Sequence, residues 1–226
     1  MDDNTQYENQ ISSKQRVSEY GEVFTSSRIV NDMLDLVHHE TERIDSRFLE
    51  PACGNGNFLV EILKRKLNVV EKKYVKNQLE YERYSIIALS SIYGVEILED
   101  NVQTCRDRLL GIFTHFYLKN YKKDFNPDFL RVAEFILSRN ILWGDALYLK
   151  TPDEKAEPIV FSEWSPVNGS MIKRRDFKMV SLLKVTDLDE MNLFSDLGDE
   201  AFIPEPVKDY PLTHFLKLFE NDYTEL

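Results

Sequence analysis

The sequence has few cysteines and no long apolar run. Its 226 residues include 2 cysteines, which is too few for a scaffold held together by disulfides. No apolar stretch is long enough to cross a bilayer, and the polar segment from Met1 to Lys14 lacks the apolar centre of a signal peptide. We therefore expect a cytoplasmic protein with no membrane partner and no structural disulfide.

Basic residues are also scarce. The chain has 28 lysines and arginines against 39 aspartates and glutamates, a formal net charge of -11. This balance argues against simple nucleic-acid binding, because a DNA-binding surface needs cations to displace counterions. Most of the acidic excess lies beyond Val185. One basic cluster, Lys173, Arg174 and Arg175, could meet phosphate, although a short run of this kind is also typical of a solvated turn or strand edge.

Apolar periodicity predicts one α/β domain. At 42% hydrophobic residues the chain can bury one substantial core. The predicted helices span residues 27–42, 57–74, 80–91, 100–117 and 128–138, and the predicted strands lie at 47–50, 92–97, 140–146 and 158–166. Residues 170–183 are compatible with a further strand or a strand and a helix. Alternation of strands and helices favours a mainly parallel sheet with helices on both faces and a ligand at the carboxyl ends of the strands.

The expected domain covers residues 16–184, between a flexible start (1–15) and an acidic tail (185–226). Within that tail, residues 192–194 and 201–204 are short apolar anchors. They suggest docking on this domain or on a partner.

A glycine-rich turn is the most informative segment of the chain. Residues 48–58 read Phe-Leu-Glu-Pro-Ala-Cys-Gly-Asn-Gly-Asn-Phe, a strand end, a turn and a helix start. Gly54 and Gly56 permit a close approach of the backbone to a ligand, and the following helix offers unpaired N–H groups. A nicotinamide-binding fold would carry a third glycine at position 59, where this chain has Leu59. The turn therefore predicts a cofactor loop of another kind.

This loop resembles that of the adenine-specific DNA methyltransferases, written aromatic-Leu-Glu-Pro-Ala-Cys-Gly-x-Gly-x-Phe, with every fixed position present here. Three further segments resemble motifs of that family, in its order. They are residues 16–25, which end in Phe24-Thr25, residues 92–97, which contain Glu96, and residues 140–146, which contain Asp145. Together the four segments cover the chain from Arg16 to Leu147.

The resemblance implies a Rossmann-like methyltransferase fold that binds S-adenosylmethionine and no metal. It implies that Phe24 and Thr25 touch the methionine part of the cofactor, that Glu96 accepts hydrogen bonds from both ribose hydroxyls, and that Asp145 takes the adenine amine. The implied cofactor contacts are Phe24, Thr25, Glu50, Pro51, Ala52, Cys53, Gly54, Gly56, Phe58, Glu96, Ile97, Asp145 and Ala146. Taken singly, Glu96 and Asp145 are also ordinary strand-end residues, and Cys53 an ordinary small buried residue. The ordered set favours the cofactor site.

The catalytic signature of that family is absent. It is Asn or Asp, then Pro-Pro, then an aromatic residue, on the loop after the fourth strand, and no two prolines are adjacent here. At a comparable distance the chain has the apolar run 158–166, in which Glu163 could accept from an amine and Trp164 could stack on a flipped-out base. Both are therefore catalytic candidates. The favoured alternative is that Trp164 belongs to the core and Glu163 to the surface.

We therefore predict an S-adenosylmethionine-dependent DNA adenine-N6 methyltransferase domain, minimal or split, from a restriction–modification system. No recognition domain is evident after Phe177, so we expect a second polypeptide to supply DNA recognition and the missing catalytic residues. Two alternatives remain open. One is a regulatory or scaffold subunit that binds the cofactor without catalysis. The other is a methyltransferase for a non-DNA substrate, recognised near Trp164.

Overall fold

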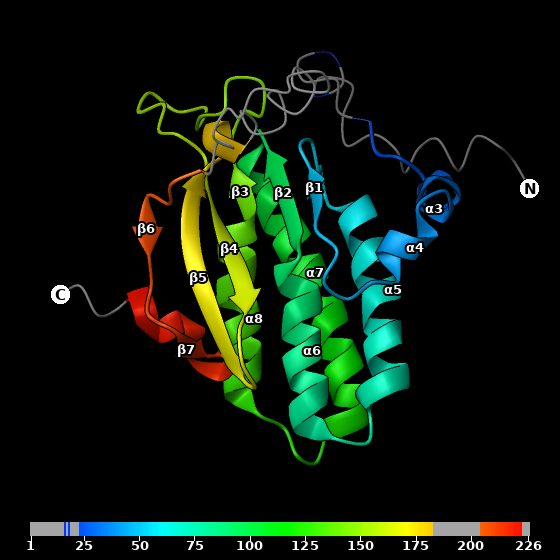
Figure 1. Ribbon diagram of the computed structural model, residues 1–226. Coiled ribbons are helices and arrows are strands. Elements are labelled where there is room, and N and C mark those ends of the chain that lie inside the picture. Colours follow the sequence, from blue (N-terminus) through cyan, green and yellow to red (C-terminus); the bar gives the residue numbers. More distant parts are fainter. Residues whose placement is uncertain (1–15, 17, 19–22, 183–203, 223–226) are drawn as a thin grey trace, which may run out of the picture.

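A three-stranded parallel sheet lies at the centre of the fold. The computed structural model describes residues 16, 18, 23–182 and 204–222. Strands β1 (Phe48–Glu50), β2 (Ile92–Glu96) and β3 (Ile141–Trp143) pair in the order β1-β2-β3 (Figure 1). Phe48 aligns with Ile92, and Gly94 aligns with Ile141. All three strands therefore end at the same edge, where the sequence predicts the ligand.

The helices between these strands form the main core. They are α5 (Asn57–Tyr74), α6 (Gln78–Ser90), α7 (Glu99–Tyr121) and α8 (Pro127–Asn140). Helix α6 begins where the Asn77 side chain accepts from Glu80 N, and α8 where Asn126 accepts from Asp128 N. Such caps satisfy N–H groups that a helix leaves unpaired at its start. Two helices follow each of β1 and β2, so the core extends well below the short strands (Figure 1).

The first predicted helix is divided in two. The sequence predicts one helix over residues 27–42, whereas the structure has α3 (Ser27–Asp35) and α4 (His38–Thr41). Val37 leaves the helical region with φ -119° and ψ 30°. The change of direction buries Thr41 completely, and its hydroxyl donates to His38 O.

A second sheet is antiparallel, which corrects the expectation that strand 158–166 joins a mainly parallel sheet. Strands β4 (Val160–Pro166) and β5 (Met171–Lys178) form a hairpin, to which β6 (Lys208–Asp209) and β7 (Thr213–His214) are added. Gly169 has φ 56°, and Met171 N donates to Asn168 O in the connecting turn. Asn-Gly is a strong signal for a hairpin turn, and this signal is present in the sequence at Asn168 and Gly169.

The two faces of the parallel sheet are covered differently. On one face Gly94 lies so close to Cys53 and Leu59 that an added Cβ would come within 2.9 Å of both side chains. On the other face Tyr93 and Val95 form an apolar cluster with three residues near or within β4 and β5, namely Ile159, Phe161 and Met179. The antiparallel sheet therefore takes the place of part of the second helical layer.

Part of the predicted acidic tail is folded onto the domain. Residues 215–222 form the 3-10 helix η1 (Phe215–Asp222), where Phe215 and Leu218 are fully buried in the core. The Asp222 carboxylate pairs with Arg139 of α8. The anchor 192–194 and all but Pro204 of the anchor 201–204 lie outside the described residues, so their docking stays a prediction. The described residues 215–222 pack on this domain.

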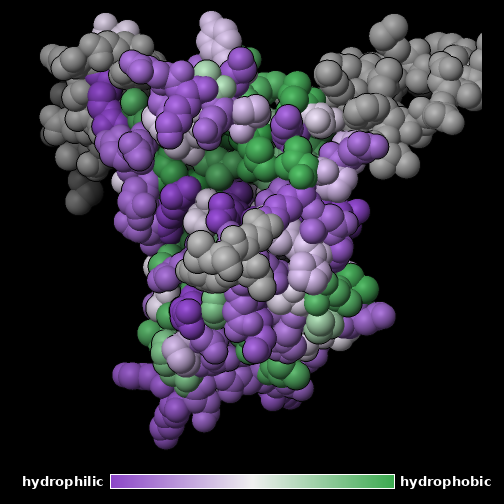
Figure 2. All heavy atoms as spheres, turned by 90° about the vertical axis from the view of Figure 1, so that its left-hand side faces the viewer, coloured by the Kyte–Doolittle hydropathy of each residue, from purple (hydrophilic) through white to green (hydrophobic). Residues whose placement is uncertain are grey.

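The surface of the described residues is mixed. Seen from the side on which β6 lies, apolar side chains gather in a band across the upper half and hydrophilic ones cover most of the rest (Figure 2). No helix in the described part of the chain combines the length and the apolar character needed to cross a bilayer. The same residues contain no histidine, cysteine and carboxylate cluster suited to a metal ion.

A buried lysine joins the segment before β1 to the start of β2. Lys66 of α5 is fully buried, and its ammonium group donates to Ile44 O at 3.2 Å, to Ser46 O and to Ser91 Oγ at 2.5 Å. Burial lowers the pKa of Lys66 to about 7. Between that value and 10.5 the unfolded chain binds a proton that the folded chain does not, so the free energy of unfolding rises with pH in this window.

We therefore expect Lys66→Met to destabilise the protein increasingly as the pH is raised from 7 to 9. The variant loses the hydrogen bonds of the Lys66 nitrogen, three for the ammonium form and two donated bonds for the neutral amine, at roughly 1–3 kcal/mol. It also lacks the rise in the free energy of unfolding that the parent shows with pH, which is up to about 1.4 kcal/mol per pH unit. Urea unfolding of both proteins at several pH values measures the difference. Lys64→Met, on the exposed side of α5, is the control and should change stability little; a pH-independent difference for Lys66→Met would contradict the prediction.

Candidate cofactor site

The glycine turn joins the end of β1 to the start of α5. Gly54 and Gly56 have φ +52° and φ +87°, in the left-handed region that favours glycine. A Cβ on Gly56 would lie 2.5 Å from the Cys105 sulfur of α7, so the backbone has no room for a side chain there. Gly56 is the residue before the helix and provides no side-chain cap for it. The first N–H groups of α5 are therefore available to a ligand.

Glu96, at the end of β2, holds this turn. One carboxylate oxygen accepts from Gly54 N at 2.8 Å, and the other accepts from Leu98 N at 3.0 Å. The residue is only 7% exposed. Each oxygen keeps a free lone pair, so the carboxylate can still accept from a further donor. The predicted strand-end acid thus lies directly beside the glycine turn.

The N-terminal motif reaches the same turn. The Phe24 ring lies 3.2 Å from where a Cβ on Gly54 would be, and Thr25 O accepts from the Asn57 side chain at 2.8 Å. Arg16 forms an ion pair with Asp100, near the start of α7, at 2.6 Å. These contacts bring a segment before α3 to the carboxyl ends of the strands.

A network that the sequence analysis missed supports the turn from α7. One Arg108 nitrogen donates to Asn55 O at 2.6 Å, to Asn55 Oδ1 at 2.8 Å and to Asn57 Oδ1 at 2.9 Å. A positive charge at this position also favours an anionic group near the turn. Nothing in the local sequence around Arg108 marks it for this contact, because the partner lies more than fifty residues away.

Asp145 follows β3 at the same edge. Gly144 N donates to Glu96 O at 2.9 Å, which aligns the ends of β2 and β3. One Asp145 carboxylate oxygen accepts from Leu147 N at 2.8 Å and from Tyr148 N at 3.2 Å. The side chain thus stabilises its own turn and is partly exposed, with one oxygen free of these contacts.

The remaining predicted contacts lie on the same three segments. Ile97 and Ala146 directly follow Glu96 and Asp145, and the others belong to the β1–α5 turn: Glu50, Pro51, Ala52, Cys53 and Phe58. Burial raises the pKa of Glu50, partly offset by the backbone N–H of Ala52. The pKa of the Cys53 thiol is raised by its hydrogen bond with Cys105 and then by burial, so it stays protonated and is no nucleophile.

Glu163 and Trp164 lie at the other end of the sheet. Glu163 pairs with Arg47, which precedes β1, at 2.7 Å, and with Arg175 of β5 at 2.7 Å. The buried indole of Trp164 donates to Asn140, which precedes β3, at 2.9 Å. Strand β4 runs opposite to the parallel strands (Figure 1), and the contacts with Arg47 and Asn140 place both side chains near the amino ends of those strands. This placement corrects the catalytic interpretation: Trp164 is a core residue, and neither shares a site with Gly54.

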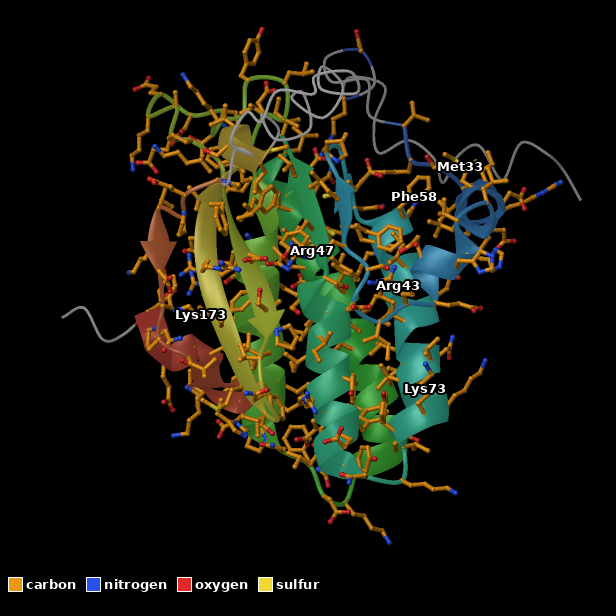
Figure 3. The ribbon with its side chains drawn as sticks, viewed as in Figure 1. Met33, Arg43, Arg47, Phe58, Lys73 and Lys173 are labelled. Atoms are coloured by element: carbon orange, nitrogen blue, oxygen red, sulfur yellow. The ribbon has the colours of Figure 1, made fainter. Side chains whose placement is uncertain are left out.

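The basic cluster is divided between two faces of β5. Arg174 is 2% exposed and donates to Asp176 and Asp222, so its guanidinium is not accessible to a phosphate. Lys173 pairs with Asp209, and Arg175 with Glu163. Figure 3 places Lys173 on the β5 side of the molecule and Phe58 across the sheet at the start of α5. The cluster is therefore not a continuous basic surface.

Comparison with known proteins identifies a family. The family model described as "MmeI, DNA-methyltransferase domain" matches residues 26–149, which is more than half of the 226-residue chain. The matched range contains the glycine turn, Glu96 and Asp145. No curated protein and no solved structure matches the chain.

Proposed function

Because the chain belongs to the MmeI DNA-methyltransferase domain family, of the restriction–modification type, we propose that it is the cofactor-binding part of a DNA adenine-N6 methyltransferase. A partner polypeptide completes this enzyme by supplying DNA recognition and the loop that holds the target base. DNA methyltransferase domains in general use S-adenosylmethionine, which supplies an activated methyl group when bound.

The observation that carries the proposal is the meeting of separate segments at one edge of the sheet. The Phe24 ring lies against Gly54, Glu96 accepts from Gly54 N, and Gly144 N donates to Glu96 O. These residues come from all four of the segments that resemble the family's motifs. An edge where parallel strands end beside a helix start is a common ligand site in α/β folds.

The residues present fit S-adenosylmethionine. The open lone pairs of Glu96 would accept from the two ribose hydroxyls, and the Asp145 carboxylate would accept from the adenine amine. Phe24 and Thr25 would border the methionine part, and the uncapped start of α5 would offer N–H groups to its carboxylate. Each group binds or orients, which is most of what methyl transfer requires of a protein.

We infer a partner because the residues of this chain supply neither a base-holding motif nor a basic surface for DNA. The 226 residues have no adjacent prolines, and Glu163 and Trp164 lie at the amino ends of the strands. The formal net charge of -11 and the ion-paired Lys173 and Arg175 provide little attraction for DNA. In this proposal a second polypeptide brings both the base-holding loop and the DNA contacts. The same absence supports a second candidate function, a cofactor-binding subunit that has no catalytic role.

We expect Glu96→Ala to lower the affinity for S-adenosylmethionine about 100-fold, because two charge-assisted hydrogen bonds to the ribose are lost. Glu163→Ala removes the same type of side chain at the other end of the sheet and should keep the affinity of the parent. Calorimetric titration of the three proteins measures both effects. Equal affinity of Glu96→Ala and the parent would refute the site, and no binding by the parent would refute the proposal.

The catalytic part of the proposal needs a second measurement on the same preparations. Methyl transfer to mixed-sequence DNA is assayed with this chain alone and with a polypeptide that carries Asn/Asp-Pro-Pro-aromatic and is encoded beside it. Transfer to adenine only when both are present supports the split enzyme. Cofactor binding without transfer in either case favours the non-catalytic subunit.

A further inference from the structure

Strand β1 has an open edge. Among the described residues β1 pairs with β2 alone, and Phe48 N donates to Ser91 O at 2.9 Å on that side. In a strand, successive residues direct their N–H and C=O groups to opposite sides. The N–H and C=O of Leu49 therefore point away from β2, where the described residues offer no strand to receive them. Such an edge accepts an additional extended segment.

Helix α3 has an apolar stripe with no cover among the described residues. Val30 and Leu34 of this helix are buried against the domain. On another side of the helix, Ile29 and Met33 are one turn apart and are 48% and 51% exposed, and directly after the helix Leu36 and Val37 are 84% and 45% exposed. These four residues form the α3 stripe. Helix α3 packs on α5, on the same side of the molecule as β1, and Met33 is labelled there in Figure 3. An apolar stripe of this kind is typical of a protein interface and not of a DNA contact.

A groove of about 430 Å³ lies beside β1, between the parallel sheet and the antiparallel sheet. Its apolar walls are formed mainly by Leu49 and Tyr93 of the parallel sheet and Phe161 and Phe177 of the antiparallel sheet. The charged groups that line it are Arg47, Arg175 and Glu163. Both arginines pair with the one carboxylate, which leaves one positive charge in excess. The groove therefore favours an apolar segment with an acidic residue.

We propose that a partner polypeptide adds an extended, apolar segment alongside β1 and covers the α3 stripe with its own apolar side chains. The segment hydrogen-bonds to the backbone of Leu49 and places an acidic residue near Arg47. This inference rests on the proposed function, because the docked polypeptide is the one that supplies the base-holding loop. Addition at β1 would bring that polypeptide next to the glycine turn, which starts where β1 ends.

The test uses this chain and the polypeptide with the Asn/Asp-Pro-Pro-aromatic sequence that is encoded beside it. Two variants alter the surface. Leu49→Pro removes the outward N–H, which an edge strand tolerates, and Met33→Asp puts a charge in the α3 stripe. Leu79→Asp is the control, since Leu79 of α6 is 49% exposed, like Met33, but lies in the first turn of a different helix. We expect each of the first two variants to raise the dissociation constant of the complex at least tenfold. The control should change that constant less than twofold.

Hydrogen exchange gives a second readout that a folding defect would not imitate. We expect the Leu49 amide of the parent to exchange rapidly in the isolated chain and at least 100-fold more slowly in the complex. Slow exchange in an isolated monomer would mean that another part of this chain occupies the edge, and a dimer with slow exchange would assign it to a second copy; either result overturns the inference. A methylating complex that all three variants form equally well overturns this inference and leaves the proposed function standing. If no adjoining reading frame encodes such a polypeptide, or its product does not bind, both fail.

Discussion

Replacement of Gly54 by valine is expected to abolish measurable binding of S-adenosylmethionine while the domain stays folded. Gly54 has φ +52°, and a Cβ there would lie 3.2 Å from the Phe24 ring. The left-handed backbone costs a residue with a side chain about 1–2 kcal/mol, and more for a β-branched one. The turn would therefore relax to another conformation, which withdraws Gly54 N from Glu96 and displaces Phe24. Two of the proposed cofactor contacts would be lost together.

Calorimetry of the parent and the variant measures the affinity, and thermal unfolding shows whether the fold survives. Gly111→Ala is the matched control. Gly111 lies within α7, and an added Cβ there meets nothing within 4 Å. The control should bind the cofactor like the parent and gain up to about 1 kcal/mol of stability, since alanine favours helix. An affinity of Gly54→Val within threefold of the parent would show that the turn does not hold the cofactor.

The long helices could be predicted from the sequence because their signals are local. Residues 57–74 were predicted as a helix and form α5, and the predictions for α6, α7 and α8 differ from the structure by a few residues at the ends. Apolar spacing over several turns determines such elements. The break between α3 and α4 was not predicted, because apolar residues continue through Leu36 and Val37 without a glycine or proline.

The second sheet could not be predicted in the same way. Strand β4 was recognised as a strand, but its direction depends on the turn at Asn168 and Gly169 and on pairing with β5. The direction decides the placement of Glu163 and Trp164, which an all-parallel sheet would have put at the cofactor edge. Pairing between distant segments has no local signature beyond the turn residues. The wrong direction predicted for β4 therefore affected both the sheet topology and the placement of the two catalytic candidates.

The cofactor edge was easier to predict because parallel strands place their ends together. Gly54 follows the predicted strand 47–50, and Glu96 and Asp145 lie near the carboxyl ends of the predicted strands 92–97 and 140–146. The structure brings the first two into contact and aligns the third beside them. The contacts of Arg108 with Asn55 and Asn57 were not predicted. They depend on the rotation of α7 about its axis, which is set by packing across the whole helix.

Arg174→Met is expected to destabilise the protein by roughly 3–5 kcal/mol, as typically follows when one partner of a buried ion pair is removed. The Arg174 guanidinium donates to Asp176 at 2.9 and 3.0 Å and to Asp222 at 2.6 Å, and it lies over the Tyr210 ring. These partners come from β5, η1 and the segment between them. Methionine would fill much of the space but leave the poorly solvated Asp176 carboxylate without a cation and Asp222 with Arg139 alone.

Chemical unfolding of Arg174→Met measures this effect, and Lys173→Met is the control. Lys173 is the preceding residue on β5 and pairs with Asp209, whose side chain is half-exposed, so its loss should cost less than about 1 kcal/mol. The comparison separates two roles for the basic cluster. A phosphate contact would weaken DNA binding without affecting stability, whereas the buried network predicts a large loss of stability from Arg174 alone. A small change in Arg174→Met would mean that β5 and η1 are held by apolar packing, with Phe215 and Leu218 sufficient to fix the C-terminal helix on α8.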